Sequence, residues 1–173
     1  MHPDFPVSET ELVFPNPSVI ENFEFTFEAG IDIDGDEISR LSFDVLDEAG
    51  VENFYEIRMN IDGAIVSLST VDLSGAEGFD SRNVIFSDET FDGERRRLSV
   101  SFSRFFWNPA FSDDIIIAWS SVNEGYFELN KTLRLQLDTD DNPFTSAVQL
   151  NSNVNNALGV IGFKNIRLDT IRP

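Results

Sequence analysis

Apolar and polar residues alternate with a period of two in two stretches near the start of this chain. Residues 23–28 set three phenylalanines against Glu and Thr, and residues 41–45 place Leu, Phe and Val on one side. A period of two is typical of a β-strand that buries one face. The turn sequence Asp34-Gly35-Asp36 lies between the two stretches, so the pattern predicts a β-hairpin.

Later segments carry the same strand signals and are separated by Asp-Gly and other turn sequences. These predicted strands cover residues 54–59, 84–86, 98–102, 115–119 and 160–166, the last reaching as far as 168. Residues 115–119 are apolar on both faces, which predicts a central strand. Four asparagines within residues 151–156 suit left-handed turns, so a loop is expected to deliver the last strand into the core.

One segment has helical instead of strand periodicity. Steps of four, three, four and four place five apolar side chains on one helical face: Val122, Tyr126, Leu129, Leu133 and Leu137. Ser121 with Glu124 three residues later forms the sequence pattern of a capping box. The competing interpretation is a strand over residues 132–137, where leucines alternate, but a strand would not need the start signal. We expect a helix over residues 121–137.

Together these elements predict a mainly β fold, an antiparallel β-sandwich or partly open barrel with one helix near residues 121–137. The helix is expected to cover one end or an exposed sheet edge. Residues 1–21 contain four prolines and predict an extended lead-in or linker. Residues 22–173 then form a single β-sandwich-like domain, a size at which about two thirds of the unfolded surface can be buried.

Composition narrows the function classes. The formal net charge of −19 argues against nucleic acid and anionic membrane surfaces as partners, because both would repel the chain. The chain has no cysteine, and its single histidine, His2, lies near the N-terminal end. Disulfides, thiolate metal sites and histidine-dependent catalytic triads are therefore excluded. Seventeen phenylalanines supply large side chains for the core.

The most suggestive acidic motif is the run from Asp32 to Asp36. Asp32, Asp34 and Asp36 alternate along the chain, and three carboxylates can converge on calcium if the backbone curls into a loop. In an extended strand the same side chains would point in parallel about 6–7 Å apart, which suits calcium poorly. A calcium site and an ordinary Asp-Gly turn are the two interpretations, and no other cofactor is expected.

The strongest candidate for a binding surface is aromatic. Phe105, Phe106, Trp107 and Phe111 lie in one segment broken by Pro109. Aromatic side chains on a loop mark contacts with protein, carbohydrate or peptide when they are exposed. The alternative is that they close one end of the sandwich. The basic run Arg95–Arg97 is interpreted as a strand start that balances the acidic surface, or else as a docking point for an acidic partner.

An ordered set of motifs gives the chain a family resemblance. The motifs are Val-Glu-Asn-Phe-Tyr-Glu-Ile-Arg (51–58), Ile-Phe-Ser-Asp-Glu-Thr-Phe-Asp-Gly (85–93), Glu-Gly-Tyr-Phe-Glu-Leu (124–129), Asn-Pro-Phe (142–144) and Ser-Asn-Val-Asn-Asn-Ala-Leu-Gly-Val-Ile-Gly (152–162). From about residue 40 onward the chain resembles the C-terminal half of the Bacteroidota domain-of-unknown-function family 4249. The family's usual glycine pair is replaced here by Asn156-Ala157.

The resemblance implies an outer-membrane lipoprotein, often encoded beside a TonB-dependent receptor, with an immunoglobulin-like domain ahead of this one. It implies export and a lipid anchor on an upstream cysteine, facing either the periplasm or the cell surface. The chain starts without the basic and apolar regions of a signal peptide. We therefore interpret it as a truncated form or a short relative. The resemblance carries no catalytic residues.

Three functional hypotheses follow. The first is a non-catalytic accessory domain that binds a TonB-dependent transporter, its cargo or both. The second is a carbohydrate- or peptide-binding module, which requires the aromatic residues 105–111 to form an exposed platform. The third is a carboxylate-dependent hydrolase, which requires two acids facing each other across a cleft about 5–10 Å apart.

Overall fold

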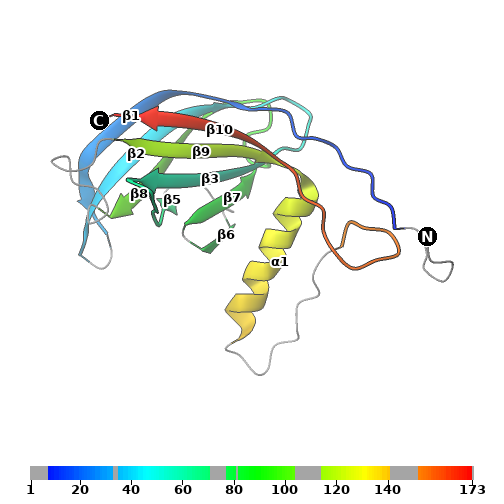
Figure 1. Ribbon diagram of the computed structural model, residues 1–173. Coiled ribbons are helices and arrows are strands. Elements are labelled where there is room, and N and C mark those ends of the chain that lie inside the picture. The colour runs from blue at the N-terminus through cyan, green and yellow to red at the C-terminus, as the bar shows by residue number, and fades with distance from the viewer. Residues whose placement is uncertain are drawn as a thin grey trace.

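The computed structural model describes residues 8–32, 35–70, 77–80, 82–103, 114–140 and 152–172, with 77–80 and 137–140 described by backbone alone. These residues form a sandwich of two antiparallel sheets and contain one helix, which confirms the predicted fold class (Figure 1). Within these residues, no helix is long and apolar enough to cross a lipid bilayer.

The first sheet has the strand order β1-β2-β8-β5. Its strands are β1 (Val19–Ile31), β2 (Glu37–Leu46), β8 (Arg95–Ser103) and β5 (Ser69–Thr70). The pairing of β1 with β2 confirms the predicted hairpin. Because β1 begins at Val19 and Ile20 is buried in the core, the folded domain reaches into the segment predicted as a lead-in.

The second sheet has the order β10-β9-β3-β7-β6, with β4 paired to β3. Its strands are β10 (Lys164–Ile171), β9 (Ile115–Val122), β3 (Phe54–Ile61), β7 (Asn83–Ser87), β6 (Glu77–Asp80) and β4 (Ala64–Ile65). β9 lies between β3 and β10, in agreement with its prediction as an inner strand. Among the described residues β10 ends the strand order, so it forms one edge of this sheet.

The core lies between the two sheets and is rich in aromatic side chains. Trp119 sits at its centre, with its ring 5.7 Å from that of Phe43 and 5.0 Å from that of Tyr55. The indole N–H donates to Ser18 Oγ, which joins the start of β1 to the second sheet. Such a buried N–H needs a partner, and Ser18 supplies it.

The basic run at the start of β8 confirms the predicted charge balance. Arg97 bonds Glu24 Oε2 at 2.8 Å and Asp44 Oδ1 at 3.1 Å, and Arg95 pairs with Glu21. These acids lie on β1 and β2, so the arginines link the start of β8 to the two strands beside it. Hydrogen bonds from Asn22 and Arg97 hold the pKa of Asp44 below its ordinary value.

The helix α1 (Glu124–Asp140) leaves the end of β9 and runs past β7 and β6 (Figure 1). The competing strand over residues 132–137 is therefore excluded. The predicted capping box was wrong, because β9 continues to Val122 and Ser121 bonds Ser18 across the sandwich instead. Asn123 takes the capping position, and its carbonyl accepts the N–H groups of Tyr126 and Phe127 at 3.0 and 3.1 Å.

The last strand differs from its prediction in start and in burial. β10 begins at Lys164, and residues 160–163 lead into it without strand pairing. They are held instead by asparagine side chains, since Asn153 bonds the backbone of Ile161 and Asn123 accepts the N–H of Phe163 at 2.9 Å. The outward apolar side chains of β10 are exposed, so it is an edge strand and not a core strand.

Candidate functional site

The predicted acidic motif forms a turn in its described part. The backbone N–H of Asp36 donates to Asp32 Oδ1 at 2.8 Å, and the Asp32 N–H donates to the Asp36 carbonyl at 2.9 Å. Gly35 has a φ of 92°, a left-handed value that glycine adopts without strain. Asp34 lies outside the described residues, so calcium binding at this motif stays a prediction.

The predicted aromatic surface cannot be placed. Phe105, Phe106, Trp107 and Phe111 all fall in residues 104–113, which lie outside the described part of the chain. The segment joins the end of β8 to the residue before β9. Its role in binding or in closing the sandwich stays a prediction.

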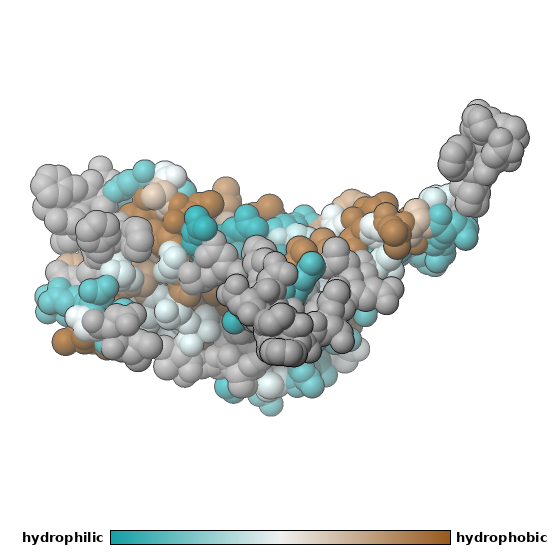
Figure 2. All heavy atoms as spheres, turned by 90° about the horizontal axis from the view of Figure 1, so that it is seen from below, coloured by the Kyte–Doolittle hydropathy of each residue, from teal (hydrophilic) through white to brown (hydrophobic). Residues whose placement is uncertain are grey.

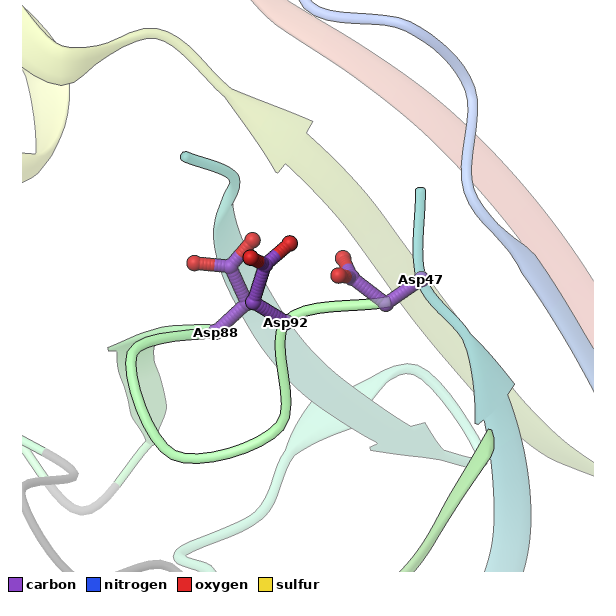
Figure 3. Close-up of side chains that lie close together, drawn as sticks. All are labelled: Asp47, Asp88 and Asp92. Carbon is purple, nitrogen blue, oxygen red and sulfur yellow. The ribbon is translucent and has the colours of Figure 1, made fainter. Parts of the chain in front are cut away.

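The structure brings together three other aspartates, here called the aspartate cluster: Asp47, Asp88 and Asp92. One carboxylate oxygen of each lies within 4.8 Å of the others (Figure 3). Asp47 follows β2, Asp88 follows β7, and Asp92 lies in the turn before β8. Sequence patterns did not reveal this cluster because its members come from two turns that are distant along the chain.

Each of these carboxylates accepts hydrogen bonds from a neighbouring loop. Asp47 accepts the Tyr55 hydroxyl and the Gly93 N–H, the latter at 2.8 Å. Asp88 accepts the Asn53 N–H at 2.9 Å, and Asp92 accepts the Gly50 N–H at 2.7 Å. The cluster thus ties the turn after β2 to the turn before β8. Carboxylate oxygens also suit calcium, but these hydrogen bonds already account for the arrangement.

The electrostatics of the cluster are unfavourable for Asp88, which is buried. Burial and the nearby charges of Asp47 and Asp92 raise the pKa of Asp88 above its ordinary value, although hydrogen bonds from Asn53 oppose the shift. As pH rises above the ordinary aspartate value, the unfolded chain loses this proton before the folded one does. The free energy of unfolding therefore falls as Asp88 is forced to ionise.

Replacing Asp88 by asparagine is expected to raise the free energy of unfolding at pH 7 by up to about 1 kcal/mol. The amide oxygen can still accept the Asn53 N–H, while the repulsion from Asp47 and Asp92 is removed. The gain should shrink as the solution is acidified, which urea titrations from pH 7 to pH 4 would measure. A gain that is independent of pH would contradict this account.

A second buried carboxylate lies on the other side of the second sheet. Glu56 is 1% exposed and accepts Lys164 Nζ at 2.5 Å, Tyr126 OH at 2.8 Å and Arg58 Nη2 at 2.9 Å. The ammonium of Lys164 also lies 4.1 Å from the centroid of the Tyr126 ring. Burial raises the pKa of Glu56, but Lys164, Tyr126 and Arg58 outweigh it and hold the pKa below its ordinary value.

Glu56 belongs to what we call the outer face, the side chains of β3, β9 and β10 that point away from the core. Strand register arranges this face in rows across β10, β9 and β3. The rows are Lys164–Val122–Phe54, Ile166–Ser120–Glu56, Leu168–Ala118–Arg58 and Thr170–Ile116–Asn60, and Ile65 of β4 pairs with Asn60.

Helix α1 packs against one end of the outer face. The Phe127 ring stacks on Phe54 at 4.6 Å, and Tyr126 bonds Glu56. Farther from the helix, four large apolar side chains are exposed and form what we call the apolar patch: Ile65 (52%), Ile116 (36%), Ile166 (56%) and Leu168 (66%). The small side chain of Ala118 lies among them, and Ile65, Ile116, Ala118, Leu168 and Arg58 line a hollow of about 330 Å³.

A second exposed apolar area lies beside the N-terminal end of the described chain. Figure 2 shows apolar side chains at the surface there as well as over the body of the sandwich. The Phe14 ring contacts the Phe163 ring in a tilted arrangement, with centroids 4.4 Å apart, yet Phe14 remains 69% exposed. Val13 and Leu158 are more exposed still. The N-terminal segment also lines a groove of about 410 Å³ with Phe54, Val122 and Asn153.

Comparisons with known proteins give a family and no activity. The family described as Domain of unknown function (DUF4249) matches residues 2–167, so the similarity begins well before residue 40. No protein of curated function matches the chain. A crystal structure of a protein from Archaeoglobus fulgidus aligns over 90% of this chain and 99% of its own, with 12% identity and a TM-score of 0.33, which is too low to carry an argument.

Proposed function

This chain belongs to the DUF4249 family, and we propose that it acts as a non-catalytic binding domain of the cell envelope, an accessory to a TonB-dependent transporter of the outer membrane. The observation that carries the proposal is the apolar patch. Four large apolar side chains from β4, β9 and β10 are at least one third exposed on one sheet face. Clustered apolar side chains of this kind mark protein contacts on soluble domains.

The buried carboxylates support a binding role over a hydrolytic one. Glu56 is held by two cations and a hydroxyl, and each member of the aspartate cluster accepts a hydrogen bond from a loop. A carboxylate hydrolase needs one acid that can give up a proton to a substrate in a cleft. Asp88 has the raised pKa that such an acid needs, but it is buried and accepts the Asn53 N–H, so we assign these acids to the packing of the domain.

The transporter as partner and the outer membrane as location come from the resemblance to family 4249. The full chain, tagged and incubated with detergent extracts of native outer membranes, is expected to recover a TonB-dependent receptor that mass spectrometry identifies. An unrelated acidic β domain of similar net charge is the control for non-specific capture. Repeated recovery of no receptor above this control would contradict the proposed function.

A further inference from the structure

The outer face differs in charge from the rest of this acidic chain. Among the side chains of β3, β9 and β10 that point outward, the charged ones are Glu56, Arg58 and Lys164. Glu56 is buried and already pairs with both cations. The accessible charge on this face is therefore positive, although the chain as a whole carries −19.

The same face has an available strand edge. β10 pairs with β9 in an unbroken register of eight residue pairs, without a bulge or a proline. On its other side it has no strand partner within the described residues. Regular edge strands of this kind can accept an additional strand, and the added strand places alternate side chains over the adjoining sheet face.

The shape of the face shows what such side chains would meet. Leu168, Ala118 and Arg58 lie in one row, so the hollow over Ala118 has an apolar wall on one side and a guanidinium on the other. The Arg58 side chain is 41% exposed and thus accessible to solvent. A large apolar side chain that crosses Leu168 would extend into the hollow, and a carboxylate two rows away on the same side of an added strand would lie beside Lys164.

We propose that the apolar patch and the free edge of β10 bind an extended segment of a partner protein that presents large apolar side chains and a carboxylate on one strand face, at every second residue. This inference rests on the proposed function and names the chemistry of its partner. The apolar side chains would pack against Ile166 and Leu168, and the carboxylate would pair with Lys164, because these three residues point to the same side of β10. A second copy of the chain fits less well, because two molecules of charge −19 repel each other.

The test uses two labelled seven-residue peptides with capped ends, which carry Ser at the odd positions, Leu at positions 2 and 4, and either Glu or Lys at position 6. Fluorescence anisotropy at about 0.15 M salt, where the long-range field of the acidic chain is screened, is expected to show that the Glu peptide binds the full chain and that the Lys peptide binds roughly tenfold more weakly or not at all. Leu168→Ser and Ile166→Ser should each weaken the complex with the Glu peptide roughly tenfold. Leu158→Ser, which changes a 96% exposed side chain outside the patch, should leave it unchanged.

Equal binding of the two peptides, no binding of either, or binding that Leu168→Ser and Ile166→Ser leave intact would overturn the inference. Analytical sedimentation gives a further contradicting outcome. If the full chain sediments as a dimer and Leu168→Ser converts it to a monomer, a second copy of the chain occupies the patch and the inference is overturned. The membrane pull-down separates this failure from that of the proposed function. If Leu168→Ser recovers the receptor as well as the unmodified chain does, the inference fails while the binding function stands.

Discussion

Replacing Glu56 by alanine is expected to lower the free energy of unfolding at pH 7 by about 3 kcal/mol. The substitution leaves Lys164 and the Tyr126 hydroxyl without the carboxylate that joins the start of α1 to β3 and β10. Removing one partner of a buried ion pair costs more than the pair itself contributes, because the remaining charge stays partly buried. Urea unfolding of the variant and the unmodified chain measures the difference.

Glu24→Ala is the matched control for Glu56→Ala. Glu24 also pairs with an arginine, but its side chain is 72% exposed, so its loss should cost about 0.5 kcal/mol or less.

The effect of Glu56→Ala should also depend on pH. Because the folded pKa of Glu56 is lowered, its contribution is present above the ordinary glutamate value and is lost as pH falls through the folded pKa. If the difference in the free energy of unfolding between Glu56→Ala and the unmodified chain stays constant from pH 7 to pH 3, the ion pair is not its cause.

Replacing Asp47 by alanine is expected to lower the free energy of unfolding by about 2 kcal/mol. Tyr55 is 1% exposed, and its hydroxyl would lose its carboxylate acceptor inside the sandwich. Burial and the hydrogen bond and charge of Asp47 raise the pKa of Tyr55 far above its ordinary value, so the hydroxyl remains a neutral donor. Relief of the repulsion on Asp88 offsets part of the loss.

Asp92→Ala separates this effect from a general loss of acidic charge. Asp92 is exposed and accepts one backbone N–H, that of Gly50, so its replacement should cost less than 1 kcal/mol.

A double-mutant cycle with Tyr55→Phe tests the contact between the Tyr55 hydroxyl and Asp47 directly. Tyr55→Phe should cost about 1 kcal/mol less in the Asp47→Ala background. If Asp47→Ala destabilises no more than Asp92→Ala, the hydroxyl contact does not stabilise the fold as we infer.

The candidate surface was partly visible in the sequence. Ile166 and Leu168 alternate with polar residues over 165–169, and this period of two is typical of a strand with one apolar face. The pattern does not say on which side of a sheet that face lies. The sequence argument assigned it to the core, whereas in the fold it points away from Trp119 and lies exposed beside Ile116.

The two carboxylate arrangements were not visible in the sequence for a different reason. Glu56 meets Lys164 across 108 residues, and Asp47 meets Asp88 and Asp92 across more than 40. With 31 acidic residues in the chain, no sequence pattern distinguishes these few from the many that face solvent. Only strand order and register bring them together.

The sequence alone determined the local structure of this protein, because alternation of apolar with polar residues fixes which side chains share a strand face and Asp-Gly pairs fix where strands reverse. It also determined the helix after β9 and the charge balance at Arg95–Arg97. The tertiary structure decided that β10 is an edge strand, where α1 begins, and which acids are buried. These outcomes depend on pairing between distant segments, and the free energy of such pairing depends on the packed neighbours and not on the local sequence.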